Sequence, residues 1–118
     1  AEKMRQHGAR AWLVNTGWTG GAYGVGNRIS LKYTRAIIDA IHSGALDDVG
    51  SVADPRFGVH VPNKCPGVPT ELLSPVNIWS DPKAFDATAK RLAGLFHTNF
   101  AQYSDGASEA IRNAGPAL

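Results

Sequence analysis

At 118 residues, 43% of them hydrophobic and 19% charged, the sequence has the size and composition of one soluble domain with a single core. A formal net charge of +2 without a basic run argues against nucleic acid as a partner, and the absence of a ~20-residue apolar stretch argues against a membrane span. Cys65 is the only cysteine and the polar N-terminus has no signal-peptide pattern, so the expected location is the cytoplasm.

The first predicted element is the end of a helix. Good helix formers fill most of the first six positions, Gly8 is a suitable stop, and no N-cap residue precedes them. The pattern indicates the last turns of a helix that starts earlier, so the chain is expected to begin inside an element. Residues 11–15, AWLVN, form a nearly continuous apolar run, which predicts a buried strand.

Residues 16–26, TGWTGGAYGVG, are predicted to form a loop. They hold five of the 13 glycines, and glycine at this density destabilises helix and strand alike. Ser30 is then a suitable N-cap for a helix that runs to about Ser43, with Gly44 as its stop. Three isoleucines place an apolar stripe along one face of that helix.

Residues 47–79 have the pattern of strands and irregular structure. Residues 49–53 and 57–61 are the expected strands, and the turn-forming pair Asp54 and Pro55 separates them. Prolines recur through the rest of this stretch and disfavour helix, at Pro62, Pro66, Pro69 and Pro75.

The strongest helical pattern follows Asp81 and Pro82, which fit an N-cap and a proline at the first helical position. Apolar residues then recur at steps of three or four, and Gly106 is the expected stop. The core is expected to take up the aromatic members of this row: Phe85, Phe96, Phe100 and Tyr103. A short helix from about Ser108 follows. The elements indicate a mixed α/β fold without an internal domain boundary over residues 1–118.

Residues 12–37 are the most informative about function, because a predicted strand, a glycine loop and a capped helix follow one another there. Such a junction suits anionic ligands, since glycines let backbone N–H groups converge and the helix start offers unpaired donors. Residues 21–26 have the G-x-x-x-x-G spacing of a phosphate loop. However, Asn27 and Arg28 stand where that motif needs lysine and then serine or threonine, so a triphosphate-binding loop of this kind is excluded.

Arg28 is the candidate ligand residue that remains. It lies between a glycine-rich loop and a helix, where its guanidinium can stack on a base or bind phosphate oxygens. The hydroxyl of Thr34, on the first turns of the helix, can hydrogen-bond a base or a ribose. The same pattern also fits a surface arginine beside a tight crossover, and spacing alone favours this second interpretation.

The same stretch resembles the ATP-dependent phosphoenolpyruvate carboxykinases. Its sequence NTGWTGGAYGVGNRISLKYTRAII is similar to a segment that ends, in the family, in G-K-R-I-S and continues into T-R-A-I. Three further runs match in the same order: PRFGVHVP, CPGVPTELLSP and KRLAGLFHTNF. The resemblance covers essentially the whole chain and falls on the C-terminal end of the family's length. It implies part of a carboxykinase-like nucleotide-binding C-terminal domain.

Members of this family convert oxaloacetate and ATP to phosphoenolpyruvate, ADP and carbon dioxide in gluconeogenesis, with magnesium on the nucleotide and often manganese at the active site. The resemblance implies that Arg28, Ile29 and Thr34 line the adenine and ribose end of the ATP pocket. Asn27 departs from the pattern, because the family has lysine there. The family's phosphate loop, metal ligands and oxaloacetate-binding arginine lie upstream. The segment is therefore expected to contain no catalytic residue and no metal ligand, and to need the missing N-terminal part of the parent enzyme.

The sequence fits three functions: part of a lyase, a freestanding nucleotide-binding module without catalysis, and a structural domain in which Arg28 is merely exposed. The isolated piece is expected to expose apolar surface that the missing part would cover. Trp18 either anchors the glycine loop or flanks the nucleotide, and its large area favours anchoring.

Two other groups of residues have simpler explanations. His60 and Cys65 are too few ligands for a zinc site, so Cys65 is expected to be a buried structural thiol. Asp47 and Asp48 follow the first long helix and are expected to form a solvated turn before the next strand.

Overall fold

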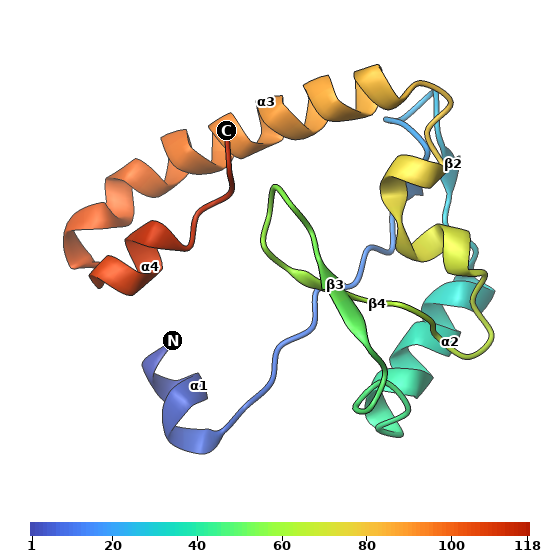
Figure 1. Cartoon of the computed structure of the whole chain (residues 1–118), viewed down its shortest axis with the longest axis horizontal. Coiled ribbons are helices and arrows are strands. Elements are labelled where there is room, and N and C mark those ends of the chain that lie inside the picture. Colours follow the sequence, from blue (N-terminus) through green and yellow to red (C-terminus); the bar gives the residue numbers. More distant parts are fainter.

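The computed structural model describes all residues from 1 to 118, as four α-helices, two small hairpins and the segments that join them (Figure 1). The helices are α1 (Glu2–His7), α2 (Leu31–His42), α3 (Pro82–Phe100) and α4 (Glu109–Asn113). The antiparallel hairpins are β1 (Trp18–Thr19) with β2 (Asn27–Arg28), and β3 (Ser51–Ala53) with β4 (His60–Pro62). Short 3-10 turns lie at Thr70–Leu73, Pro75–Asn77 and Ala101–Gly106. The expected mix of helix and strand is confirmed, as two separate sheets.

The starts of the two long helices follow the caps in the sequence. The hydroxyl of Ser30 accepts a hydrogen bond from the backbone N–H of Lys32 at 3.3 Å, and α2 begins there. The carboxylate of Asp81 accepts from the backbone N–H of Lys83 at 2.8 Å, with a proline at the first position of α3. Both starts are therefore determined locally, because these side chains satisfy backbone donors that a helix leaves free.

The ends of the first two helices are also as predicted. Gly8 ends α1 with a left-handed φ of 59°, and Gly44 adopts a φ of 75° just after α2. The N–H of Ala45 then donates to the carbonyl of Ala40 at 3.0 Å, which completes a Schellman C-cap. Glycine is suited to both positions because it reaches positive φ without a Cβ penalty.

The buried strand expected at residues 11–15 is wrong. These residues belong to neither hairpin, and Leu13 is 87% exposed. A strand must share its backbone hydrogen bonds with a neighbour, and no segment of this chain pairs with residues 11–15. Apolar composition indicated burial, but it could not supply the partner.

The second hairpin has the predicted turn but shorter strands. The carboxylate of Asp54 accepts from the backbone N–H groups of Arg56 at 2.9 Å and Phe57 at 2.7 Å, which fixes the chain reversal. Val52 pairs with Val61 at the centre of the ladder. Residues 57–59, expected to be strand, therefore belong to the turn.

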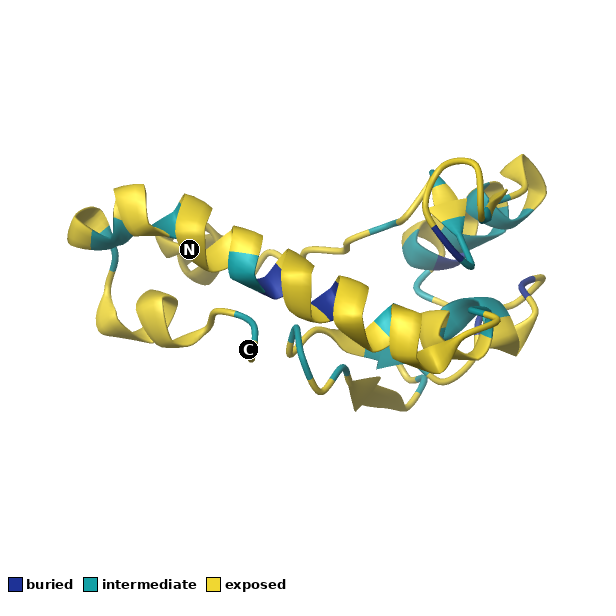
Figure 2. Ribbon diagram, turned by 90° about the horizontal axis from the view of Figure 1, so that it is seen from above, coloured by how far each residue is buried: buried dark blue, intermediate teal, exposed yellow.

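The long C-terminal helix exists as predicted, but the aromatic core expected along it is wrong for Phe96 and Tyr103, whereas Phe85 and Phe100 are half-buried. Phe96 is 52% exposed and Tyr103 is 60% exposed, whereas the buried residues of α3 are Ala89 and Ala93. Figure 2 shows exposed surface along most of the helix. The apolar stripe is real, but no other element of the chain covers all of it.

The only core cluster lies beside α2. It consists of Ala40, Leu46, Cys65 and Val68, with half-buried neighbours around it. Only 7 of the 118 residues are buried, and the accessible surface is 8813 Å², whereas a compact monomer of this size exposes about 6,200 Å². The radius of gyration, 15.8 Å, likewise exceeds the roughly 13.5 Å of a compact domain. The expected exposure of apolar surface is confirmed.

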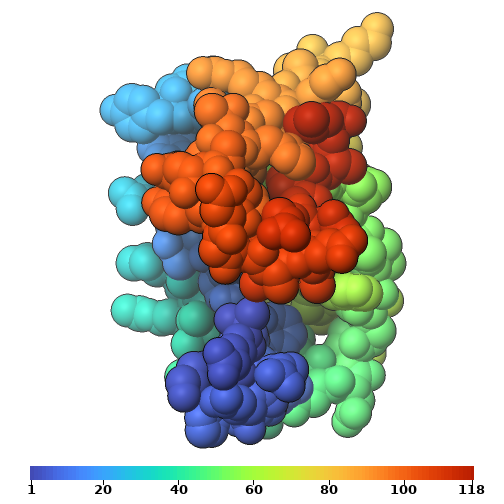
Figure 3. Space-filling view, turned by 90° about the vertical axis from the view of Figure 1, so that its left-hand side faces the viewer, coloured from blue at the N-terminus to red at the C-terminus, as the bar shows by residue number.

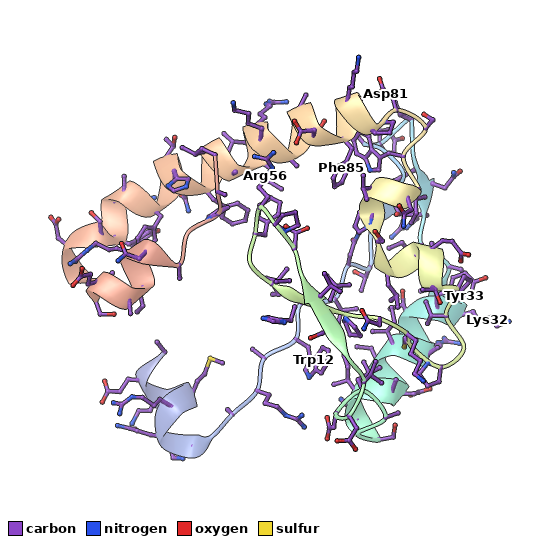
Figure 4. The ribbon with its side chains drawn as sticks, viewed as in Figure 1. Trp12, Lys32, Tyr33, Arg56, Asp81 and Phe85 are labelled. Carbon is purple, nitrogen blue, oxygen red and sulfur yellow. The ribbon has the colours of Figure 1, made fainter.

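The two ends of the chain lie on the same side of the molecule (Figures 1 and 3). The tail after α4 returns to α3, where the carbonyl of Pro116 lies 2.6 Å from the Nε2 of His97 in the last turn of the helix. Arg56, at the tip of the β3–β4 hairpin, reaches toward α3 (Figure 4) and pairs with Asp86 at 2.6 Å. Its guanidinium also donates to the carbonyl of Ala117 at 3.3 Å. Polar contacts therefore join the tail, the hairpin and α3.

Candidate functional site at the glycine hairpin

The glycine-rich segment is a closed hairpin rather than an open loop. In the ladder, Trp18 lies opposite Arg28 and Thr19 lies opposite Asn27. The N–H of Ile29 donates to the carbonyl of Gly17 at 2.9 Å and extends the ladder by one bond. The hairpin thus places Arg28 next to Trp18, which lies ten positions earlier in the sequence. The loop prediction holds for the residues between the strands, but the pairing was missed.

Two glycines fix the path of this hairpin. A Cβ on Gly26 would lie 2.5 Å from the carbonyl oxygens of Gly21 and Thr19, so no larger residue fits there. Gly20 has a φ of 74°, and a Cβ on it would lie 3.2 Å from the side chain of Ile78. The loop is therefore folded closely on itself and against the turn before α3, because its backbone atoms occupy the space of the missing side chains.

The side chain of Asn15 organises the chain just before β1. Its Oδ1 accepts from the backbone N–H of Gly17 at 3.0 Å, and its Nδ2 donates to the carbonyl of Trp18 at 3.0 Å. This local pattern is typical of an asparagine that organises a turn.

Trp18 packs within the hairpin. Its ring meets that of Tyr23 edge to face, with 5.0 Å between the centroids and 79° between the planes. Trp18 remains 36% exposed and Tyr23 is 84% exposed. Trp18 therefore makes an aromatic contact within the hairpin, and its two expected roles, anchoring the loop to the core and flanking the nucleotide, both stay predictions.

Arg28 presents a free cation on β2. Its side chain is exposed, and the ion pairs of the chain join other residues, Arg10 with Asp47 and Arg56 with Asp86. Neighbouring Ile29 is half-buried, and Ser30 then begins α2. The predicted residues Arg28 and Ile29 thus stand at the junction of a closed hairpin and a capped helix.

Thr34 lies one turn into α2, and Lys32 and Tyr33 before it mark this end of the helix in Figure 4. The hydroxyl oxygen of Thr34 is buried and has no hydrogen-bond partner. An unpaired buried hydroxyl costs about 1–3 kcal/mol, so a partner for it is expected when the site is complete. In this structure the hydroxyl does not share the exposed surface of Arg28, and its contact with a nucleotide stays a prediction.

Two cavities lie elsewhere in the molecule. One of about 440 Å³ separates the β3–β4 hairpin from the 3-10 turns, and one of about 240 Å³ lies beside Arg56 and Phe85. Neither is lined by Arg28, Ile29 or Thr34.

An ion pair from Arg10 to Asp47 joins the N-terminal segment to the turn after α2. The guanidinium of Arg10 donates to both carboxylate oxygens of Asp47, at 2.7 and 3.1 Å. These hydrogen bonds lower the pKa of Asp47 and raise that of Arg10. Asp47 and Asp48 form the exposed turn that was expected. The pairing with Arg10 was missed, since nothing in the sequence relates positions so far apart.

No cluster of three or more His, Cys, Asp or Glu side chains gathers in a way that could hold a metal ion. The Nδ1 of His60 contacts the hydroxyl of Ser51 at 3.2 Å, across the second hairpin. Cys65 is 6% exposed, and burial raises the pKa of its thiol, which confirms the buried structural cysteine.

None of the helices has the length and hydrophobicity required to span a bilayer.

Known proteins similar to this chain share one description. The family model for phosphoenolpyruvate carboxykinase matches residues 1–71. A phosphoenolpyruvate carboxykinase (ATP) of Salinibacter ruber is 55% identical over 118 residues, and one of Dictyostelium discoideum is 53% identical over 118 residues. One of Thermus thermophilus is 51% identical over 115 residues. The matches cover 100%, 100% and 98% of this chain but 22%, 21% and 22% of those relatives, so the chain spans about a fifth of their length.

Proposed function

Because the chain belongs to the ATP-dependent phosphoenolpyruvate carboxykinase family, we propose that it forms the adenine and ribose side of an ATP site. The parent enzyme would convert oxaloacetate and ATP to phosphoenolpyruvate, ADP and carbon dioxide, as a lyase of gluconeogenesis. Within it, this segment would be part of the nucleotide-binding C-terminal domain, with Arg28, Ile29 and Thr34 as its nucleotide contacts.

The observation that supports this proposal is the free guanidinium of Arg28 at the end of a closed hairpin. The arginine is permanently charged, has no acidic partner in the chain, and projects from a backbone that Gly26 holds in one path. Because the backbone that carries Arg28 is already in place, the ordering cost on nucleotide binding is confined to its side chain.

The rest of the ATP site would come from the other part of the parent enzyme. Phosphoryl transfer needs groups that clamp the γ-phosphate, and a divalent metal supplies the charge that the transferring group develops. This chain has no cluster of metal ligands, so magnesium on the nucleotide and manganese at the active site would be held elsewhere. The residues of this chain would bind and orient the base and sugar. A single cysteine fits the reducing cytoplasm as the location.

The test is a full-length chimera. This segment replaces the matching 118 residues of the Salinibacter ruber relative, and carboxykinase activity is measured against ATP concentration. Arg28→Ala is expected to raise the KM for ATP about 10- to 150-fold, since a hydrogen bond to a charged group contributes ~1.5–3 kcal/mol. Arg91→Ala is the matched control, because Arg91 is an exposed arginine on α3.

An unchanged KM in Arg28→Ala would overturn the proposal. The alternative, a freestanding nucleotide-binding module, is tested by titrating the isolated chain with Mg-ATP. We expect binding no tighter than about millimolar, or about −4 kcal/mol. Saturable micromolar binding that Arg28→Ala removes would instead favour the freestanding module.

A further inference from the structure

The glycine hairpin carries a second feature, an exposed aromatic ring that the proposed function leaves without a role. Tyr23, near the turn of the hairpin, is 84% exposed, although a phenol ring of this size gains free energy when it is covered. Its ring is nevertheless held, since the indole of Trp18 meets it edge to face at 5.0 Å. One edge-to-face neighbour leaves most of the tyrosine ring open to a flat partner.

The backbone beneath this ring is fixed. Gly26 packs against the carbonyl oxygens of Thr19 and Gly21, and the backbone N–H groups of Val25 and Gly26 donate to the carbonyl of Ala22 at 3.0 and 2.9 Å. An aromatic side chain on a rigid loop has only two torsions left to order when a ligand binds. The exposed ring therefore lies on a hairpin whose backbone is already arranged before a ligand binds.

The strand register adds a cation to this surface. Trp18 lies directly opposite Arg28, so their side chains leave the same face of the β1–β2 ribbon. Trp18 thus has the ring of Tyr23 as its aromatic neighbour and Arg28 as its partner across the ladder. We call Trp18, Tyr23 and Arg28 the hairpin platform.

Aromatic rings and an unpaired guanidinium fit a ligand that is flat, π-rich and attached to negative charge. A nucleotide has this chemistry, because its base stacks on aromatic faces and its phosphates attract arginine. We propose that the hairpin platform is the base-stacking wall of the ATP site, with the adenine on Tyr23 and with Trp18 as the positioning residue that holds the tyrosine ring. This inference rests on the proposed function and adds two residues to it.

The experiment compares ATP with inorganic tripolyphosphate in the full-length chimera. Tyr23→Leu keeps the apolar bulk and removes the aromatic face. Stacking of one base contributes enough for its loss to weaken ATP binding about 5- to 150-fold. Affinity for tripolyphosphate, which has no base, is expected to stay the same. Trp18→Leu is expected to weaken ATP binding less than Tyr23→Leu does, because it leaves the stacking ring in place.

Two variants accompany the measurement. Tyr23→Phe restores the ring and is expected to recover most of the affinity that Tyr23→Leu loses. Tyr103→Leu makes the same change at another exposed tyrosine, 60% exposed and outside the hairpin, and is expected to leave ATP binding unchanged.

The outcomes separate this inference from the proposed function. Unchanged ATP affinity in Tyr23→Leu, with weakened affinity in Arg28→Ala, would overturn the platform and leave the proposed function intact. An equal loss for ATP and tripolyphosphate would also overturn it, because the ring would then support the loop rather than the base. If Arg28→Ala has no effect on ATP either, the proposed function fails as well.

Discussion

Helices α2 and α3 begin alike but are packed differently. Both start at a capping side chain and carry an apolar stripe at helical spacing. On α2 the stripe meets Leu46, Cys65 and Val68, which follow it in the chain and form the only buried cluster. On α3 only two alanines are buried. An apolar stripe therefore indicates which face of a helix is suited to burial. Whether that face is buried depends on another segment of the fold that packs against it.

The largest expected effect tests this difference with the same substitution in both regions. Leu46 is 5% exposed, so Leu46→Ala is expected to lower the free energy of unfolding by about 2–4 kcal/mol. Leu95 on α3 is 55% exposed, and Leu95→Ala is expected to cost less than about 1 kcal/mol. Urea unfolding of the 118-residue chain measures both. Equal losses would mean that α3 is as well packed as the α2 cluster.

A second pair of variants compares two glycines. In Gly26→Ala the new Cβ would lie 2.5 Å from two carbonyl oxygens of the hairpin, so a loss of about 1–3 kcal/mol is expected. Gly94 lies inside α3, and a Cβ there meets no atom within 4 Å. Gly94→Ala should therefore stabilise the chain by about 0.5–1 kcal/mol through helix propensity. Thermal melting reports both, and a destabilised Gly94→Ala would show that the face of α3 at Gly94 is covered.

The smallest expected effect concerns the ion pair between Arg10 and Asp47, beside the α2 cluster. Hydrogen bonding to Arg10 lowers the folded-state pKa of Asp47 below its unfolded value of about 3.9. The contribution of the pair to stability is therefore present above about pH 3.9 and is lost as the pH falls through the lower folded-state pKa. Both side chains are exposed, so the effect is slight and screened by salt.

Chemical-shift titration of the Asp47 carboxyl measures this effect. Its midpoint should rise toward the ordinary value in Arg10→Gln and at high salt. A midpoint that Arg10→Gln leaves in place would mean that another group holds the carboxylate charged.

Prediction from sequence succeeded where neighbouring residues decide the outcome. Ser30 and Asp81 began helices because each satisfies backbone donors within three residues, and Gly44 ended one because it reaches positive φ. It failed at residues 11–15 and along the aromatic row of α3, since burial and pairing depend on segments that the local pattern does not identify.

The candidate site divides in the same way. The sequence by itself determined that a dense glycine loop precedes a capped helix with Arg28 between them, and the family resemblance assigned that arginine to a nucleotide. Only the tertiary structure decided that the loop closes into a hairpin, that Trp18 lies opposite Arg28, and that Tyr23 stays exposed. The physical reason is range: caps and glycine turns depend on bonds between near neighbours, whereas register and exposure depend on backbone contacts that the whole chain arranges.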